Sequence, residues 1–444
     1  TSAPQSITTL SLKYSLEWAT QTSSRSSKIG AATIAYAAGT DDGSGATYVA
    51  GLFYGGARFA SDATGNEFRS QSLALDSFLT RFDADGNVVW NNHLGRSVGG
   101  AQIQALAVDT VLGVVYVTGS YSNDLYLDPN PLSPPTLNAS DAYGTDLFVA
   151  SYEAATGHLL WAFSGSAYGF SANGWSVAVD ESPARNLLLS GQFSLVLFFE
   201  TQAVADALFA VGQPDSFLAL VSSNGTMLSL TQYSPGSLDG VLALASAIPV
   251  PGSGVPGLSY DILLSGSITD NSPYNSLFLM PLSNSSSAAV TFVARNTMDL
   301  VANTVSLVWR VSLGDPNGGL CSFAQTGVPP GPNALGAVYV AGFCTATTLQ
   351  FVDSSNVATQ LWTSGSSSNV IQNANVLALD LVTGGYLWLT VLESFAAAQG
   401  PVFAAPGSGA FSLAFATGGL PTIAGSYTGI LENLPFYLPP ATYQ

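Results

Sequence analysis

The sequence predicts an all-β protein made of six tandem repeats of four antiparallel strands, and three observations predict this class. The first is a short apolar strand that ends in a small residue and glycine, found six times in 444 residues, at 48–51, 116–119, 188–191, 263–266, 339–342 and 422–425. The second is a strand of small residues ahead of each copy, and the third is a hairpin after the first five copies. Self-similarity at a regular spacing is the signature of repeat architectures.

The strand ahead of each glycine strand is the first strand of a unit, and it alternates small and apolar residues. It lies at 33–36, 105–108, 176–179, 243–245, 322–324 and 412–415. The third strand begins with Asp or Asn, at 76–79, 146–149, 215–218, 275–278 and 375–378. A tight turn with glycine follows it at 85–87, 156–158, 224–226 and 383–385, as expected for hairpins. The fourth strand then carries a tryptophan in four copies, namely Trp90, Trp161, Trp309 and Trp388, and Leu-Ser-Leu at 228–230 in the third copy.

Four short antiparallel strands that recur about every 70 residues are typical of the blades of a β-propeller. We therefore predict a six-bladed β-propeller of four-stranded antiparallel blades, with residues 1–444 as a single domain. The small residues of the first strand suit the crowded axis, and the tryptophan suits the outermost strand, where its ring covers the next blade. A series of separate sandwiches is the alternative, but sandwiches lack a strict four-strand period.

The ends of the chain are predicted to complete the last blade together. After Trp388 only a first strand (410–416) and a second strand (from 420) remain. The missing two strands have candidates at 7–10 and 16–19, where Trp18 is in phase with the other tryptophans. We therefore expect residues 6–22 to close the ring, although the segment between the two candidates has no glycine. The alternative is that these strands cross to another subunit.

Two insertions interrupt the repeat. One is predicted near 284–303, between the third and fourth strands of the fourth unit, and one near 326–336, between the first two strands of the fifth unit. A serine-rich stretch at 353–370 is a further long loop. Long loops tend to carry contacts.

The composition bounds the function. Only 9% of residues are charged, against about a quarter in ordinary soluble proteins, and the net charge is −18. Lys13 and Lys28 are the only lysines, so the sequence offers no basic patch and excludes nucleic acid as a partner. No apolar run approaches the roughly 18 residues of a membrane span. A neutral, hydroxyl-rich surface indicates a glycan coat, dense assembly with copies of itself, or a secreted domain that merely has few charges.

The chain starts at Thr1 without a signal sequence, and we expect a mature secreted protein from which the signal peptide has been removed. Cys321 lies on a first strand and Cys344 follows the second strand of the same unit, so a disulfide is predicted, with two buried thiols as the alternative. Asn138, Asn224 and Asn284 begin N-glycosylation sequons, a number that chance explains in so serine-rich a chain. Asn224, in a tight turn, is the least certain acceptor.

The chain offers little material for catalysis, so we predict no catalytic, cofactor-binding or metal site. It has two histidines, His93 and His158, which we expect at the surface, and two cannot form a three-histidine metal site. Residues 83–87 resemble a calcium loop, but other units have a plain hairpin turn at this point. Other loop acids lie at 41–42 and 124–128, and a glycosidase or lyase would need two carboxylates close together on one rim.

At the residue level the unit resembles the SBBP (seven-bladed β-propeller) repeat. The stretches that carry the resemblance are 115–119, 146–150, 156–161 and 175–180. The resemblance covers nearly the whole chain, although this sequence has six units where the family name implies seven. It implies an extracellular or cell-surface propeller, often of unassigned activity, and it supplies no catalytic residues.

These observations favour an extracellular, non-enzymatic structural protein that packs with itself into a fibre, coat or cell-surface layer. The alternative is a monomeric binding module that uses exposed aromatic residues such as Tyr121, Tyr143 or Tyr168 for glycan or protein ligands. A polysaccharide-active lyase or hydrolase is a third reading. Sizing of the purified protein separates the first two.

Overall fold

The structure is a computed structural model of the 444-residue chain. It describes residues 22–24, 33–40, 44–59, 68–70, 75–95, 100–127, 136–139, 144–167, 170–180, 182–199, 207–210, 214–233, 241–250, 253, 259–269, 290–299, 304–314, 321–328, 336–344, 348–353, 355, 357–363, 373–392, 407–415 and 421–428. The candidate N-terminal strands at 7–10 and 16–19 lie outside these residues.

Five antiparallel sheets contain the predicted four-stranded unit, each with its strands hydrogen-bonded in chain order. The first unit comprises β2 (Thr33–Thr40), β3 (Thr47–Tyr54), β6 (Leu75–Phe82) and β7 (Val88–Leu94). The second comprises β8 (Ala101–Asp109), β9 (Val114–Tyr121), β10 (Asp146–Glu153) and β11 (Leu159–Ser166). The third comprises β12 (Ala172–Val179), β13 (Leu187–Phe193), β16 (Asp215–Val221) and β17 (Met227–Tyr233).

The second half of the chain continues the pattern. The fourth unit comprises β18 (Val241–Pro249), β19 (Ser259–Thr269), β20 (Val290–Asp299) and β21 (Thr304–Gly314). The fifth comprises β22 (Cys321–Gly327), β23 (Ala337–Cys344), β26 (Asn373–Asp380) and β27 (Tyr386–Leu392). The sixth sheet of the series has two strands among the described residues, β28 (Gly407–Phe415) and β29 (Pro421–Thr428).

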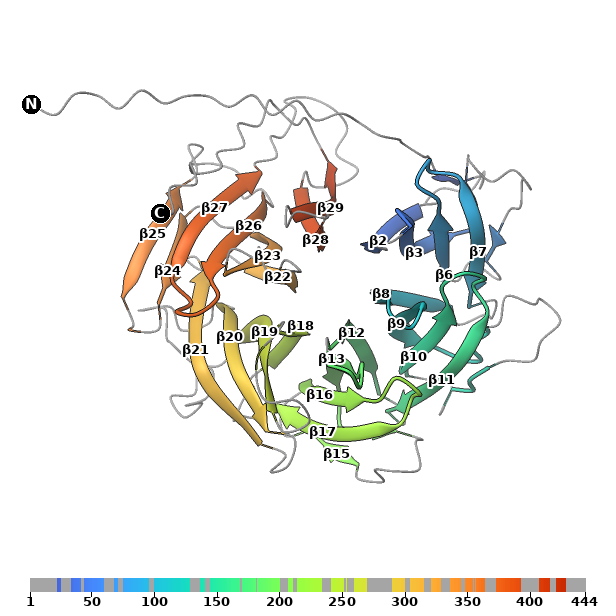
Figure 1. Cartoon of the computed structure of the whole chain (residues 1–444), viewed down its shortest axis with the longest axis horizontal. Helices are drawn as coiled ribbons and strands as arrows, with labels where there is room; N and C mark the ends of the chain where they lie inside the picture. The colour runs from blue at the N-terminus through green and yellow to red at the C-terminus, as the bar shows by residue number, and fades with distance from the viewer. Residues whose placement is uncertain are drawn as a thin grey trace, which may run out of the picture.

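The first strands of the successive sheets line the centre of a closed ring (Figure 1). Each contacts the next around the circle, in the order β2, β8, β12, β18, β22 and β28, and β28 contacts β2. The chain is therefore a β-propeller, as the spacing of the repeats predicts.

A β-bulge in each first strand explains why every second strand has a glycine, which lies two or three residues before the end of the strand. In the second unit the register shifts after Ile103, which lies opposite Gly119, and the same shift occurs opposite the glycine in the other units. A bulge pushes extra backbone toward the partner strand. A Cβ atom on Gly119 would lie 1.8 Å from the carbonyl oxygen of Gln102, so no side chain fits there.

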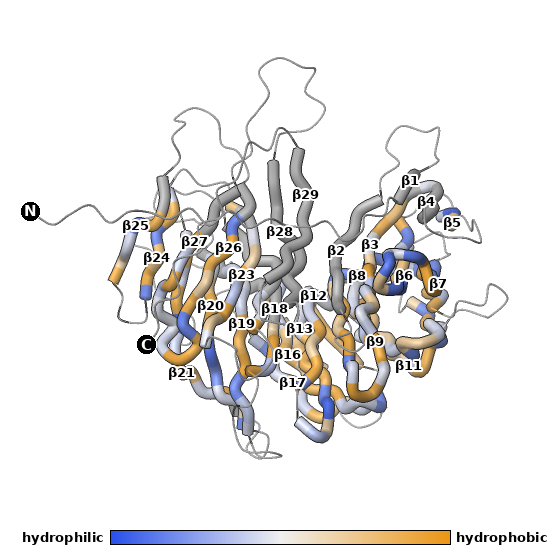
Figure 2. The backbone as a smooth tube through the Cα atoms, turned by 45° about the horizontal axis from the view of Figure 1, so that its top comes forward, coloured by the Kyte–Doolittle hydropathy of each residue, from blue (hydrophilic) through white to orange (hydrophobic). Residues whose placement is uncertain are grey.

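The core lies between the sheets. The second and third strands are buried on both faces, and all eight residues of β9 are buried. Such strands have continuous apolar runs because each face packs on a neighbouring sheet, and hydrophobic segments accordingly recur in strands around the ring (Figure 2). One core cluster, for example, joins Val149 of the second unit to Leu189 and Phe217 of the third.

The predicted insertion at 284–303 is wrong in its place. The structure has the third strand of the fourth unit at β20, inside that range, so the extra residues precede the third strand and lie at 270–289, outside the described residues. Residues 275–278 mimic the polar start of the other third strands. The register decides, because Phe292 of β20 lies opposite Gly266 as Phe148 lies opposite Gly119. In the fifth unit the predicted loop at 326–336 separates β22 from β23.

Short hairpins lie between the second and third strands of three units, and in the third and fifth units they pair with the preceding unit, a feature that the repeat pattern does not predict. In the third unit this hairpin comprises β14 (Val196–Phe199) and β15 (Leu208–Phe209), and β14 pairs with β11 of the second unit. In the fifth unit it comprises β24 (Thr348–Val352) and β25 (Ala358–Thr363), and β24 pairs with β21. In the first unit it comprises β4 (Gly56–Phe59) and β5 (Phe68–Arg69), and β4 pairs with β1 (Thr22–Ser24). Residues 358–363, part of the expected serine-rich loop, are therefore strand.

Candidate functional site

The most regular polar feature of the molecule is the junction between one unit and the turn of the next. The indole nitrogen of Trp90 donates a hydrogen bond to the carbonyl oxygen of Ala154, at 3.0 Å. Trp161 donates to Ser223 and Trp309 to Leu381, each also at 3.0 Å. Each acceptor belongs to the turn between the third and fourth strands of the following unit, so the fourth strand of one blade is tied to the next blade.

A glycine of the same turn lies under each tryptophan ring. Gly157 has a φ of +74°, which a residue with a side chain rarely adopts, and a Cβ there would lie 2.8 Å from the ring of Trp90. Gly225 and Gly384 have the same relation to Trp161 and Trp309. The turn glycine therefore serves two purposes, because it provides the turn with positive φ and leaves room for the ring.

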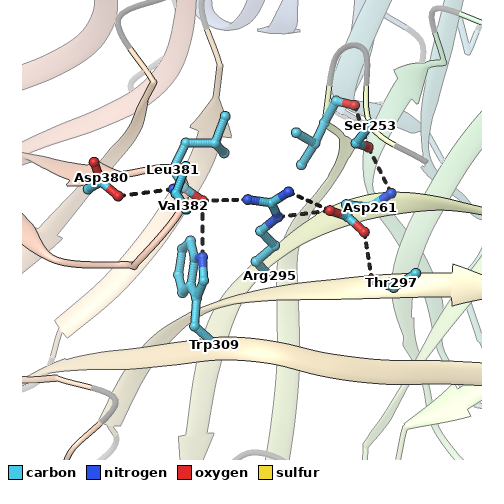
Figure 3. Close-up of polar contacts among 9 residues, drawn as sticks. Ser253, Asp261, Arg295, Thr297, Trp309, Asp380, Leu381 and Val382 are labelled. Atoms are coloured by element: carbon cyan, nitrogen blue, oxygen red, sulfur yellow. Dashed lines mark hydrogen bonds and ion pairs between the residues drawn. The ribbon is translucent and has the colours of Figure 1, made fainter.

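Arginine strengthens the junction between the fourth and fifth units (Figure 3). Arg295 on β20 lies between Asp261 of its own sheet and the carbonyl oxygen of Leu381, which its Nη1 atom reaches at 2.9 Å. Its Nε atom donates to Asp261 Oδ2 at 3.0 Å, and the hydroxyl of Thr297 donates to the other carboxylate oxygen at 2.6 Å. Leu381 thus accepts from both Arg295 and Trp309.

Two further arginines also join neighbouring units. Arg185, in the turn between β12 and β13, donates two hydrogen bonds of 2.9 Å to the carboxylate of Asp109 at the end of β8. The Asp109 side chain is fully buried, so this bidentate pair is of the strong, charge-assisted kind. Arg81 donates to the carbonyl oxygen of Ala155 in the turn of the second unit, at 3.3 Å. Arg81, Arg185 and Arg295 thus each serve a contact between neighbouring blades.

His93 is the histidine whose surroundings could suit proton transfer. The prediction that it lies at the surface is wrong. Its side chain is 13% exposed and its Nε2 atom lies 2.7 Å from Oδ2 of the buried Asp76. The rings of Phe53 and Phe68 pack on the imidazole, with centroids at 5.0 and 5.3 Å. A histidine paired with a buried carboxylate also occurs in hydrolases, where it takes up a proton.

The third unit has an equivalent contact between its third and fourth strands, made by glutamine in place of histidine. Gln232 occupies the position of His93, since it lies opposite Phe217 as His93 lies opposite Phe78. Its amide donates to Asp215 at 2.7 Å, as His93 bonds with Asp76. An amide makes the same contact with the aspartate, so the pairing itself does not require an imidazole.

The turn at 83–87 joins β6 to β7 as a hairpin. The carboxylate of Asp83 accepts hydrogen bonds from the backbone of Asp85 and Asn87 and from the Asn87 side chain. These bonds hold the pKa of Asp83 below its ordinary value, chiefly through the Asn87 side chain. Asp380 caps the turn of the fifth unit in the same way, through the backbone of Val382 and Thr383.

The two cysteines lie on neighbouring strands of the fifth unit. The Cα atoms of Cys321 on β22 and Cys344 on β23 are directly opposite each other, and the sulfur of Cys344 belongs to a disulfide. Asn375 donates to that sulfur at 3.2 Å. That Cys321 and Cys344 form this disulfide in the purified protein stays a prediction.

The predicted glycosylation and ligand-contact residues have different surroundings. Asn138 and Asn224 are exposed, the former beside the bridge between Leu125 and Leu137 and the latter in the turn of the third unit. Asn284 lies outside the described residues. His158 is exposed, as predicted. Tyr121, expected to be an exposed aromatic, is buried, and its hydroxyl donates to the carbonyl oxygen of Asn138; Tyr143 and Tyr168 lie outside the described residues.

Within the described ranges, no three His, Cys, Asp or Glu side chains lie close enough together to hold a metal ion. No helix among these residues is long and apolar enough to cross a membrane. Among the described residues, the predicted site residues are spread over several blades, and the structure brings together Cys321 with Cys344 and Tyr121 with Asn138.

The known proteins that are similar to this chain are distant from it. No family model matches the chain, and no curated protein matches it. Among solved structures, the Dos1 propeller is similar over 89% of this chain and 90% of its own, with a TM-score of 0.38 and 10% identity. A Synechocystis apocarotenoid oxygenase mutant is similar over 78% and 61%, with a TM-score of 0.31 and 10% identity. The rhamnogalacturonan lyase YesW is similar over 80% and 68%, with a TM-score of 0.24 and 10% identity. Likenesses this distant carry no argument about activity.

Proposed function

We propose that this chain is an extracellular, non-enzymatic structural protein that assembles with copies of itself into a fibre, coat or cell-surface layer. The observation that carries the proposal is the set of apolar side chains that the fourth strands expose. The residue ahead of the tryptophan position is exposed and aliphatic in four units, namely Val89, Leu160, Leu228 and Val308. Phe209, on the crossing strand β15, is 68% exposed.

An outer wall of this kind suits contact with another protein surface. Interfaces are depleted of charge at their centre and enriched in aromatic residues, and this chain has only 9% charged residues. Single exposed apolar residues are ordinary on monomers, but here they recur from blade to blade and nearby charges are scarce. Assembly would cover them.

Edge strands provide a second route to association. Among the described strands, β15 and β25 end their sheets and contain no Lys or Pro to block the pairing of another strand. Both belong to the hairpins that lie on the outside of the ring (Figure 1). A neighbouring copy could extend these sheets through backbone hydrogen bonds.

The proposal includes a finer account of the fold. We take the six units as six four-stranded blades of one ring, related to SBBP-type repeats, with the last blade completed from the N-terminal segment. Six bulges at equivalent positions, each opposite a glycine, support this account. Secretion, a disulfide and glycans at Asn138, Asn224 or Asn284 would fit the same setting. The binding-module and enzyme readings lack a matching observation among the described residues.

Sizing by light scattering, combined with electron microscopy, tests the proposed assembly. We expect the purified protein to form particles with a regular repeat, and Phe209→Lys to weaken this association. His158→Lys is the matched control, because it adds the same charge at an exposed polar position and should leave assembly unchanged. A protein that stays monomeric at high concentration would overturn the proposal and favour the binding module.

A further inference from the structure

The strands that line the centre of the ring are open to solvent, unlike the strands behind them. Five of the nine residues of β8 and four of the eight residues of β12 are partly exposed, whereas all eight residues of β9 are buried. Both β8 and β12 end their sheets, so each has a backbone edge at the centre without a partner strand (Figure 1). We propose that this centre binds a neutral saccharide, with one sugar stacked on the indole of Trp175.

Trp175 is the extra residue of the β-bulge in β12. The register passes from Gly174, which lies opposite Gly191, to Ser176, so Trp175 has no opposite residue on β13. A bulge of this kind re-aims the side chain that it carries. None of the core clusters among the described residues includes Trp175, and its side chain is partly exposed. Small residues are expected next to the axis, so this tryptophan departs from the pattern without serving the core.

A hydrogen bond fixes the indole of Trp175. Its Nε1 atom donates to Oε1 of Gln192 on β13 at 3.1 Å. Asn173 lies directly opposite Gln192 in the register of the two strands, and both residues are partly exposed. An indole that is already held in place costs less ordering when a ligand binds to its face.

The second unit adds amide side chains at the equivalent place. Gln104 is the extra residue of the bulge in β8, as Trp175 is in β12, and its Nε2 atom donates to Oε1 of Gln102 at 3.4 Å. Gln102 and Asn173 also correspond, because each lies two residues before the extra residue of its strand. Since β8 and β12 are in contact, the amides and the indole gather at the end of the centre where these strands begin.

The absence of charge indicates which class of ligand fits. The six first strands contain a single charged residue, Asp109, which is buried and paired with Arg185. A charged ligand would lose hydration here without gaining an opposite charge. A neutral sugar has an apolar C–H face that packs on an aromatic ring, and hydroxyl groups that both donate and accept hydrogen bonds, as amide side chains do. Ligand sites commonly combine aromatic side chains with a few polar groups in this way.

This site goes beyond the proposed assembly and does not depend on it. The apolar side chains that carry the assembly lie on the outer strands, whereas Trp175 lies on an innermost strand. Copies that associate through their outer strands therefore leave the centre of each ring open. The site also needs none of the tyrosines that the sequence suggests for a monomeric binding module.

Isothermal titration calorimetry of the full chain tests the site. The probes are cellohexaose, mannohexaose and chitohexaose, with hexagalacturonic acid as the charged counterpart. We expect a neutral saccharide to bind and the acidic one not to bind. Trp175→Ala should weaken the binding by about tenfold or more, as expected for the loss of a central aromatic contact. Gln104→Leu, which removes an amide but nearly keeps the size of the side chain, should weaken it as well.

A matched control and a measure of folding complete the experiment. Tyr386→Ala removes an aromatic side chain that is 40% exposed on β27, a fourth strand, and should leave the affinity unchanged. Thermal denaturation shows whether each variant is folded, and Gln104→Leu decides the question if Trp175→Ala does not fold.

Three results would overturn the proposal. They are binding of the acidic saccharide alone or of no saccharide, an affinity that neither Trp175→Ala nor Gln104→Leu changes, and an equal loss in Tyr386→Ala. Light scattering of the same samples keeps this test apart from that of the proposed function. Particles that bind no saccharide count against the site only, and a monomer that binds one counts against the assembly only.

Discussion

Individual residues at the junctions explain which positions of the repeat must be tryptophan and glycine. The tryptophan at the end of one blade and the glycine in the turn of the next form one contact, in which the glycine leaves space for the ring. The sequence shows both residues but not that they meet, because about 60 residues separate Trp161 from its acceptor Ser223. The contact between His93 and Asp76 could not be predicted for a similar reason, because the residues next to a histidine in a strand do not show whether it is buried.

Replacement of Trp161 tests the junction. Trp161→Phe keeps an aromatic ring against Gly225 but loses the hydrogen bond to Ser223, so we expect the free energy of unfolding to fall by about 1 kcal/mol. Urea denaturation measures the change. Leu160→Ala, at the exposed neighbouring residue, should change it by less than about 0.5 kcal/mol. Equal stability of Trp161→Phe and the unaltered protein would contradict the role of the indole.

Tyr116 makes stability depend on alkaline pH. Burial, with the nearby Asp109 charge, raises its pKa from 10.0 to about 12, so the folded state favours the neutral phenol. The unfolded state loses the phenolic proton first, so this contribution to stability is complete below pH 10 and is lost as the pH rises toward 12. Tyr116→Phe should therefore lose less stability over this range, measured by denaturation midpoints at several pH values. Parallel curves for the two proteins would contradict this prediction.

The crossing hairpins are the elements that fasten one blade to the previous one. The third unit sends β14 to β11, and Phe199 on β14 packs on Phe163 of the second unit and Phe217 of the third. The short apolar run at 196–199 is typical of a strand, but the sheet that receives it depends on the fold of another unit. The prediction placed the third strand of the fourth unit at 275–278 for a similar reason. That segment and β20 both fit the local sequence pattern, and only the strand register shows which of them is the third strand.

Two phenylalanines of one hairpin provide a matched test. Phe199 is buried, and we expect Phe199→Ala to lower the free energy of unfolding by about 3 kcal/mol or more, the usual cost of a buried Phe→Ala change. Phe209, in the partner strand, is largely exposed, so Phe209→Ala should change stability by less than about 0.5 kcal/mol. Thermal and urea denaturation measure both. Similar losses in the two variants would show that the hairpin does not anchor the blades as described.

At the scale of the whole molecule, the order of the strands and the ring could be predicted because the evidence is local and repeated. Each turn glycine, each small-residue strand and each glycine strand is visible in the sequence, and their regular spacing favours a propeller. The bulges opposite Gly119 and its counterparts could not be predicted, since a bulge is a relation between two strands. Few site residues could be predicted, because the composition offers little chemistry, and the cysteine pair depends on strand register alone.

The crossing hairpins also bear on how the ring responds to pulling forces. Because β14 belongs to the third unit through the chain and to the second through its hydrogen bonds, separating those blades must break backbone hydrogen bonds as well as side-chain contacts. The pairing of β24 with β21 resists the separation of the fourth and fifth units in the same way. A force that separates these blades must therefore also separate a short antiparallel strand pair at each of the two junctions. We expect these two junctions to resist separation more than a junction held by side-chain contacts alone.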